Sequence, residues 1–178
     1  KKHRGREPIS CRLVFDLLRT AGADRVMSVD LHAAQTQGFF DGPVDHLIAM
    51  PGLVDYIRDR FDGHLDNVTV VSPDAGRIRV AEQWAQRLGG GPLAFVHKTR
   101  DITRPNQAKA NRVVGDVKGK DCVLVDDLID TAGTIAGACQ VLREAGARSV
   151  TVVATHGVLS GPAVDRLKSC GAREVVLT

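Results

Sequence analysis

The most informative stretch of the chain is Cys122-Val-Leu-Val-Asp-Asp-Leu-Ile-Asp-Thr-Ala-Gly-Thr134. Its apolar, β-branched run from Cys122 to Val125 is typical of a strand buried on both faces of a parallel sheet. Acidic, hydroxyl and small residues then predict a loop. From Thr134 to Gly146 the apolar spacing predicts a helix, with a hydroxyl near its beginning and a glycine at its end. The stretch therefore predicts a strand, a loop and a helix in that order.

The predicted loop lies at the carboxyl end of a strand, where ligands bind in open α/β sheets. Free N–H groups at the beginning of the next helix favour an anion. Asp126 and Asp127 can accept hydrogen bonds from neighbouring sugar hydroxyls. The other end of the loop offers hydroxyls and backbone N–H groups from Asp130, Thr131, Ala132, Gly133 and Thr134. A ribose phosphate suits both ends; the alternative is that the two aspartates only cap a turn.

The rest of the chain predicts an α/β fold. Strands are expected at 67–72, 93–97, 149–155 and 173–177, and helices alternate with them. This alternation predicts a largely parallel sheet covered by helices on both faces. A boundary near Gly42 and Pro43 divides the chain into residues 1–43, the remnant of one α/β unit, and residues 44–178, a more complete second unit.

Two earlier segments carry candidate metal ligands. Asp30 lies near the end of a strand expected at 25–31, and Asp30 and His32 project from the same face if the strand persists that far. They suit an N/O metal site or a phosphate contact, although a lone histidine at a strand end is more often structural. The turn from Ser72 to Arg77 leads from a strand into a helix, and Asp74 there is either a ligand or a helix N-cap.

Lys98 and Arg100 follow the strand expected at 93–97, and their spacing of two places both cations on one face. The polar segment 101–110 has no clear period and is interpreted as a mobile, charged lid. The alternative is a solvated strand end followed by a surface loop.

Composition excludes several classes of function. Lys1, Lys2, Arg4 and Arg6 account for the net charge of +3, because residues 7–178 hold 20 basic and 21 acidic side chains. This balance, with only seven Phe, Tyr and Trp residues, argues against nucleic-acid binding. The four cysteines form no C-x-x-C pair, so we expect neither a zinc site nor disulfides, and a cytoplasmic location. No apolar run approaches the roughly 18 residues of a membrane span.

Four ordered motifs resemble one enzyme family. The stretch 122–134 resembles the signature for phosphoribosyl pyrophosphate that phosphoribosyltransferases and ribose-phosphate diphosphokinases share. The segment Asp30–Asp45 is similar to a signature of the diphosphokinases that the transferases lack. The segments Ser72–Arg77 and Lys98–Arg100 also match motifs of the diphosphokinases. With these four motifs, the chain is identified as a member of the diphosphokinase family over essentially all 178 residues. The resemblance implies that the family's earlier N-terminal segment and final C-terminal stretch are absent from this chain.

The resemblance implies a type I phosphoribosyltransferase-like fold, with 1–43 ending a first domain and 44–178 forming most of a second. It implies transfer of the diphosphoryl group of ATP to ribose 5-phosphate in nucleotide biosynthesis, although the chain shows no P-loop motif. Phosphate and ADP as effectors and a homo-oligomer are also implied. Two alternatives remain, a phosphoribosyltransferase and a non-catalytic regulatory relative.

The resemblance also assigns roles to single residues. It implies Mg²⁺ binding by His32 and Asp74, catalysis by Lys98 and Arg100, and contact of Arg100 with ribose 5-phosphate. The matching pyrophosphate loop consists of Asp74, Ala75, Gly76 and Arg77. Many family members have glycine at the position of Arg77, and an arginine there can itself reach a phosphate.

Overall fold

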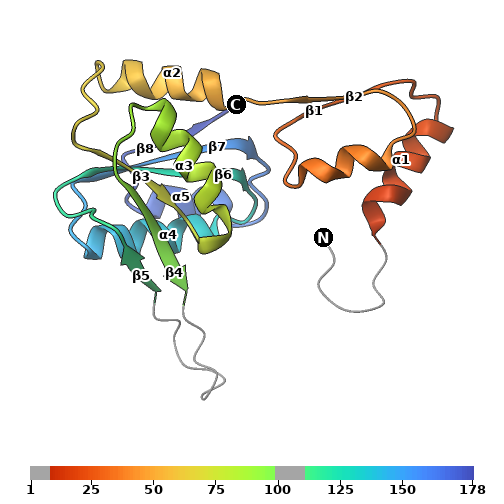
Figure 1. Ribbon diagram of the computed structural model, residues 1–178. Helices are drawn as coiled ribbons and strands as arrows, with labels where there is room; N and C mark the ends of the chain where they lie inside the picture. The colour runs from red at the N-terminus through yellow and green to blue at the C-terminus, as the bar shows by residue number, and fades with distance from the viewer. Residues whose placement is uncertain (1–8, 99–110) are drawn as a thin grey trace. The chain divides into compact units, whose positions relative to one another are not determined.

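The computed structural model describes residues 9–98 and 111–178. The chain divides into two compact units, Lys1–Ala49 and Met50–Thr178 (Figure 1). This division differs from the boundary expected at Gly42 and Pro43, because those residues form the turn before a short strand that pairs within the first unit. Assignment of the units to a first and a second domain of a longer protein stays a prediction.

The first unit contains α1 (Ser10–Thr20), β1 (Val26–Val29), η1 (Ala34–Phe39) and β2 (Val44–Leu47). The two strands pair in parallel, from Val26 opposite Val44 to Val29 opposite Leu47. Phe15 of α1 packs on Phe40, with ring centroids 5.8 Å apart. The other large apolar side chains of the α1 region are exposed, namely Ile9, Leu13, Val14, Leu17 and Leu18.

The second unit is a six-stranded sheet with helices. Its elements are α2 (Met50–Arg60), β3 (Val68–Ser72), η2 (Ala75–Arg77), α3 (Ile78–Arg87), β4 (Leu93–Lys98), β5 (Asn111–Val114), β6 (Asp121–Ile129), α4 (Gly133–Glu144), β7 (Ser149–Gly157), α5 (Ala163–Ser169) and β8 (Glu174–Leu177). The strand order is β5-β4-β3-β6-β7-β8, and only β5 runs antiparallel to its neighbour. The prediction of a largely parallel α/β sheet is confirmed.

The core of this unit follows from alternation along β6. Cys122 and Leu124 are fully buried and belong to one apolar cluster with Cys139 and Leu142 of α4. Val123 and Val125 are also buried, and strand geometry turns them to the opposite face of the sheet. Helices α2 and α3 lie on one side of the sheet and α4 and α5 on the other (Figure 1). A run of apolar residues without polar interruption is therefore stable at the centre of the sheet.

The order of the strands creates the position for a site. Strands β3 and β6 are parallel neighbours, with Val68 opposite Asp121 and Val71 opposite Leu124. From β3 the chain crosses through α3 to β4 on one side, and from β6 it crosses through α4 to β7 on the other. Ligands of open α/β sheets bind where the order reverses in this way. The loops after β3 and β6 meet at this point.

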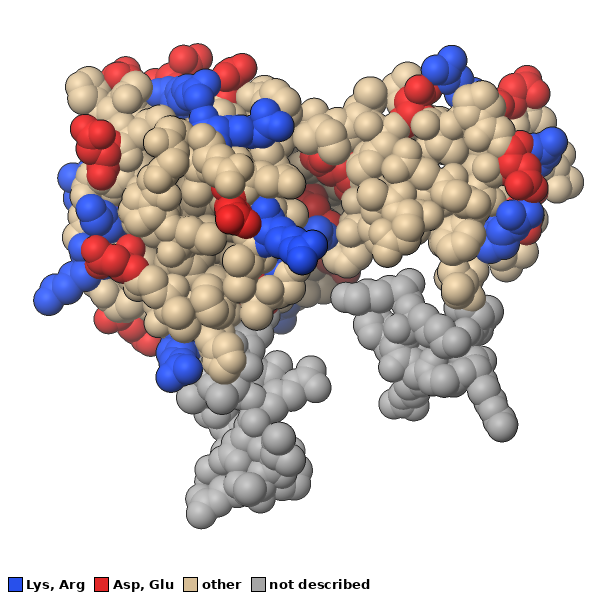
Figure 2. Space-filling model, in the orientation of Figure 1, with Lys and Arg blue, Asp and Glu red and all other residues tan. Residues whose placement is uncertain are grey.

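Charges are mixed over the face shown in Figure 2, where basic and acidic side chains alternate on the described residues. Within residues 9–98 and 111–178, none of the helices is long and apolar enough to cross a membrane. The expectations of no nucleic-acid partner and no membrane partner stay predictions.

Candidate functional site

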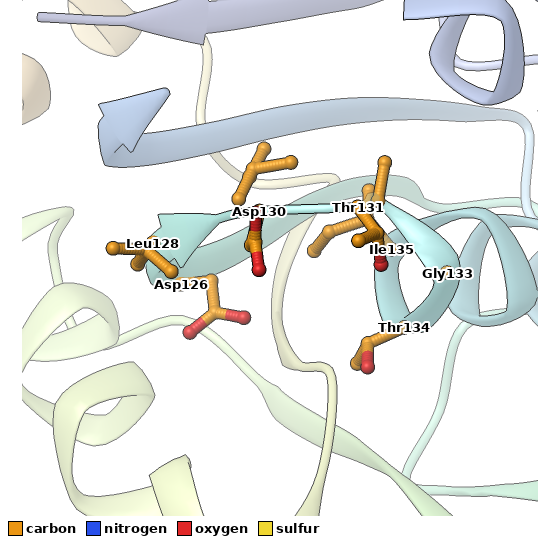
Figure 3. A pocket seen from close by; sticks show the side chains of 9 residues that line it. Asp126, Leu128, Asp130, Thr131, Gly133, Thr134 and Ile135 are labelled. Atoms are coloured by element: carbon orange, nitrogen blue, oxygen red, sulfur yellow. The ribbon is translucent and has the colours of Figure 1, made fainter. Parts of the chain in front are cut away.

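A hollow lies between the end of β6 and the beginning of α4. Its lining consists of Asp126 and the run Leu128, Ile129, Asp130, Thr131, Ala132, Gly133, Thr134 and Ile135. Figure 3 shows Asp126 on the strand side and Thr131 and Thr134 at the beginning of the helix. Carboxylate and hydroxyl groups therefore reach the hollow from opposite ends.

The beginning of α4 differs from the expectation of a hydroxyl cap. The residue before the helix is Ala132, which is 4% exposed and adopts a left-handed conformation with φ of +58°. Its methyl group offers no acceptor to the first N–H groups of α4, which have no partner within a helix. These N–H groups can therefore serve an anion, and the helix dipole adds roughly 0.3–2 kcal/mol per favourable contact.

The two aspartates lie on the strand and not in the loop, which corrects the expected end of the strand at Val125. Strand β6 continues to Ile129 because it pairs with β7, with Asp126 opposite Ala154. Asp126 lines the hollow, whereas the side chain of Asp127 forms an ion pair with Arg77. The two carboxyl groups remain close enough to interact with each other.

The carboxyl group of Asp126 has a raised pKa. Burial and, to a smaller degree, the neighbouring side chain of Asp127 together raise the pKa of Asp126 to about 7. The backbone N–H of Asp127, which donates to Asp126 Oδ1 at 2.8 Å, lowers the same pKa. Near neutral pH the Asp126 carboxyl therefore exists in both forms, and it can donate a hydrogen bond as well as accept one.

The turn after β3 is organised by Asp74. Its Oδ1 accepts a hydrogen bond from the Gly76 N–H at 2.9 Å, and its backbone oxygen accepts one from Ser72 Oγ at 2.6 Å. The interpretation of Asp74 as an N-cap is confirmed, for the short helix η2, which consists of Ala75, Gly76 and Arg77. Metal binding by Asp74 stays a prediction.

The other metal candidate lies in the first unit. Strand β1 ends at Val29, and Asp30 has a φ of +45°, so the strand does not persist to His32. Asp30 Oδ2 accepts a hydrogen bond from the Ala49 N–H at 3.2 Å. His32 and Asp74 belong to different units, and their common role stays a prediction. Among the described residues, no three His, Cys, Asp or Glu side chains form a metal-binding group.

Of the two predicted catalytic residues, Lys98 and Arg100, the structure describes only the backbone of Lys98. The backbone of Lys98 ends β4 and is paired with Asn111. The Lys98 side chain, Arg100 and the lid segment 101–110 lie outside the described part of the chain.

Comparison with known proteins decides the family. Residues 46–175 match the family model described as the phosphoribosyl transferase domain. The chain belongs to this family. The phosphoribosyl transferase domain thus covers nearly all of the second unit and both loops of the site.

Relatives extend the match to the whole chain. A ribose-phosphate pyrophosphokinase of Bifidobacterium longum is 92% identical over 178 residues, which are 100% of this chain and 52% of the relative. One from Corynebacterium efficiens is 68% identical and has 54% of its length covered. The crystal structure of phosphoribosylpyrophosphate synthetase from Mycobacterium smegmatis matches with a TM-score of 0.88 and 63% identity, covering 99% of this chain and 56% of that chain.

These matches confirm the resemblance to ribose-phosphate diphosphokinases, another name for the pyrophosphokinases, and the phosphoribosyltransferase-like fold. The chain spans about half the length of the curated relatives that it matches.

The sequence did not predict that the segment after β7 contacts the β6–α4 loop. The segment after β7 donates three hydrogen bonds to the backbone of the β6–α4 loop, from Leu159, Ser160 and Arg166. The turn residues Gly161 and Pro162 signal a tight connection here. Nothing in the sequence indicates that this connection supports the loop.

Proposed function

We propose that the chain contributes the ribose 5-phosphate site of a ribose-phosphate diphosphokinase. In the proposed reaction the diphosphoryl group of ATP is transferred to the anomeric hydroxyl of ribose 5-phosphate, giving phosphoribosyl pyrophosphate and AMP. The observation that carries the proposal is one hollow that has Asp126 at one end and the uncapped beginning of α4 at the other. The printed names of the 92% and 68% identical relatives support the same activity.

The proposed acceptor is held by its two ends. Sugar hydroxyls bond to the carboxyl of Asp126, and the phosphate takes backbone N–H groups between Thr131 and Thr134 together with their hydroxyls. Contact of Asp127 with the sugar stays part of the proposal, and its ion pair with Arg77 holds the Asp127 carboxylate in place. Holding the acceptor in one orientation lowers the entropic part of the barrier to transfer.

The residues around the β3–η2 turn fit a magnesium ion. Mg²⁺ prefers oxygen ligands and is commonly held by one or two carboxylates together with substrate phosphates, so it needs no complete cage of protein groups. Asp74 offers such a carboxylate in the turn after β3, and β3 is the parallel neighbour of β6, the strand that carries Asp126. Magnesium bound there supplies positive charge to the transferring phosphoryl groups. We propose His32 as a further ligand of this Mg²⁺ ion.

Charge on the transferring group also needs protein cations. We assign this role to Lys98 and Arg100, which carry the spacing of the family motif. Preorganised cations stabilise the charge that develops in phosphoryl transfer without a covalent intermediate. We also propose that the native protein is a cytoplasmic homo-oligomer that serves nucleotide biosynthesis. Phosphate and ADP are its proposed effectors.

The proposal is tested by binding and by product analysis. Calorimetric titration of the chain with ribose 5-phosphate should show one site, and Asp126→Asn should weaken it about tenfold or more, since charge-assisted bonds contribute roughly 1.5–3 kcal/mol. The exposed Asp165→Asn on α5 is the control. In the native protein, AMP should form from ATP and ribose 5-phosphate with magnesium. Pyrophosphate release that depends on a nucleobase would instead identify a phosphoribosyltransferase.

A further inference from the structure

The backbone of the β6–α4 loop is held by the segment that follows β7. The carbonyl oxygens of the last residue of β6 and of the next two residues accept hydrogen bonds: Ile129 from the Leu159 N–H at 3.1 Å, Asp130 from the Ser160 N–H at 3.0 Å, and Thr131 from Arg166 Nη1 at 2.8 Å. Two donors are backbone groups, and the third is the guanidinium of α5. The loop is therefore shaped by an element that follows it in the sequence by about thirty residues.

Fixing these carbonyls also fixes the direction of the N–H groups. In a trans peptide the C=O of one residue and the N–H of the next point in opposite directions. The structure contains no cis peptide bond in its described residues. Arg166 draws the Thr131 carbonyl toward α5 and thereby turns the N–H of Ala132 away from α5. Ala132 is also the residue in the left-handed conformation, which L-residues adopt unfavourably without outside support.

Arg166 also places a positive charge beside the beginning of α4. A Cβ atom built on Gly133 would lie 3.5 Å from Arg166 Nη1. The guanidinium is therefore close to the first residue of the helix, which belongs to the lining of the hollow. Both the orientation of the peptide and the charge favour an anion at this end of the hollow.

We propose that Arg166 is a positioning residue for the phosphate end of the site. It acts through the Thr131–Ala132 peptide and not by contact with the substrate. The inference rests on the proposed function in one respect, namely that the anion is the phosphate of ribose 5-phosphate. The ordering of the loop by Arg166 does not depend on the identity of the ligand.

The first test therefore uses the ligand-free chain. Backbone ¹H–¹⁵N heteronuclear NOE values of Thr131, Ala132 and Gly133 report the order of the loop on the picosecond to nanosecond timescale. Arg166→Met should lower them clearly, and Arg166→Lys, which keeps a charged donor, should recover part of the loss. Lys168→Met, an exposed change on the same helix, is the matched control. Unchanged values in Arg166→Met would overturn the proposal.

The second test separates phosphate binding from general destabilisation. The affinity for ribose 5-phosphate should fall about tenfold in Arg166→Met, recover partly in Arg166→Lys and stay unchanged in Lys168→Met, as expected for loss of one charged hydrogen bond. The affinity for ribose, which lacks the phosphate, should change less than about twofold. Equal losses for both ligands would contradict a role at the phosphate end. If the unaltered chain binds no ribose 5-phosphate, the proposed function fails, and the NOE comparison alone decides the role of Arg166.

Discussion

The guanidinium of Arg77 forms an ion pair with the carboxylate of Asp127, and both side chains are largely buried, with 18% and 14% exposed. Arg77 ends the turn after β3, and Asp127 lies near the end of β6. The pair therefore joins the predicted pyrophosphate loop to the strand that carries Asp126. It also explains how an arginine is accommodated at this position, because its side chain fills the space beside Asp127.

Breaking this pair should cost more than loss of a surface ion pair. Arg77→Met leaves the Asp127 carboxylate largely buried without its cation, and we expect the free energy of unfolding to fall by about 2 kcal/mol. The affinity for ribose 5-phosphate should also fall, because Asp126 adjoins the unpaired charge. Urea unfolding and calorimetry measure both effects. Arg79→Met, an exposed change on α3, should alter neither; equal effects of the two variants would contradict a special role of the pair.

The pKa of Asp126 predicts how stability depends on pH. This pKa is raised from 3.8 to about 7 in the folded chain, so the folded state binds the proton more tightly between these values. The free energy of unfolding should consequently fall as the pH rises from about 4 to about 7. Asp126→Asn removes this contribution and should stabilise the chain at about pH 8 by on the order of 2 kcal/mol, with no gain below about pH 4.

Urea unfolding of both proteins across this pH range checks that prediction. The neutral variant should be more stable at high pH and yet bind ribose 5-phosphate less tightly. A stability difference that does not change with pH would show that Asp126 titrates normally in the folded chain. The exposed Asp165→Asn should leave the pH dependence as it is.

Gly133 is predicted to be needed for ligand binding and not for the stability of the fold. A Cβ atom there would meet Arg166 Nη1 at 3.5 Å and Thr131 Oγ1 at 3.9 Å, which are ordinary contacts. Gly133→Ala should therefore change stability by no more than about 1 kcal/mol. Gly133→Val adds a branched side chain at the beginning of α4 and should reduce ribose 5-phosphate affinity strongly. Thermal unfolding and titration distinguish the two effects; a large loss of stability in Gly133→Ala would contradict the prediction.

A second ion pair supports the beginning of β6. Asp121 is 3% exposed and accepts hydrogen bonds from the Arg148 guanidinium and from Ser149 Oγ at 2.7 Å. The Arg148 hydrogen bond lowers the pKa of Asp121, so this interaction stabilises the fold above pH 3.8 and is lost as the pH falls below it. Because Arg148 is itself mostly exposed, Arg148→Met should lower stability at pH 7 less than Arg77→Met does. Urea unfolding at pH 7 and about pH 3 should show the difference shrinking in acid; a constant difference would exclude the ion pair as its cause.

The proposed catalytic cations should affect turnover more than binding. In the native protein, Lys98→Ala and Arg100→Ala should each lower kcat by about 10²–10³-fold, as removal of one preorganised charge commonly does. Steady-state kinetics of AMP formation measure the effect, with the exposed Lys168→Ala as control. A raised KM at unchanged kcat would assign both residues to ground-state binding.

Local sequence was sufficient for the main elements and for the loop that lines the hollow. The apolar run 122–125, the glycine after α4 and the alternation of strands and helices predicted the parallel sheet and a ligand loop after β6. These features are local because hydrophobic period and turn residues act over a few positions. The short strands β2 and β5 were not predicted, since four residues carry little periodic signal before they pair with a neighbour.

The roles within the site required the tertiary structure. Pairing with β7 extends β6 through both aspartates, although aspartate disfavours strands, and the fold then places Asp126 in the hollow and Asp127 beside Arg77. Arg77 reaches Asp127 across 50 positions of sequence, and Arg166 reaches Thr131 across 35. Such contacts depend on which strands are neighbours and on which face each helix packs. No local pattern encodes that choice, because it is made by the burial of the whole apolar core.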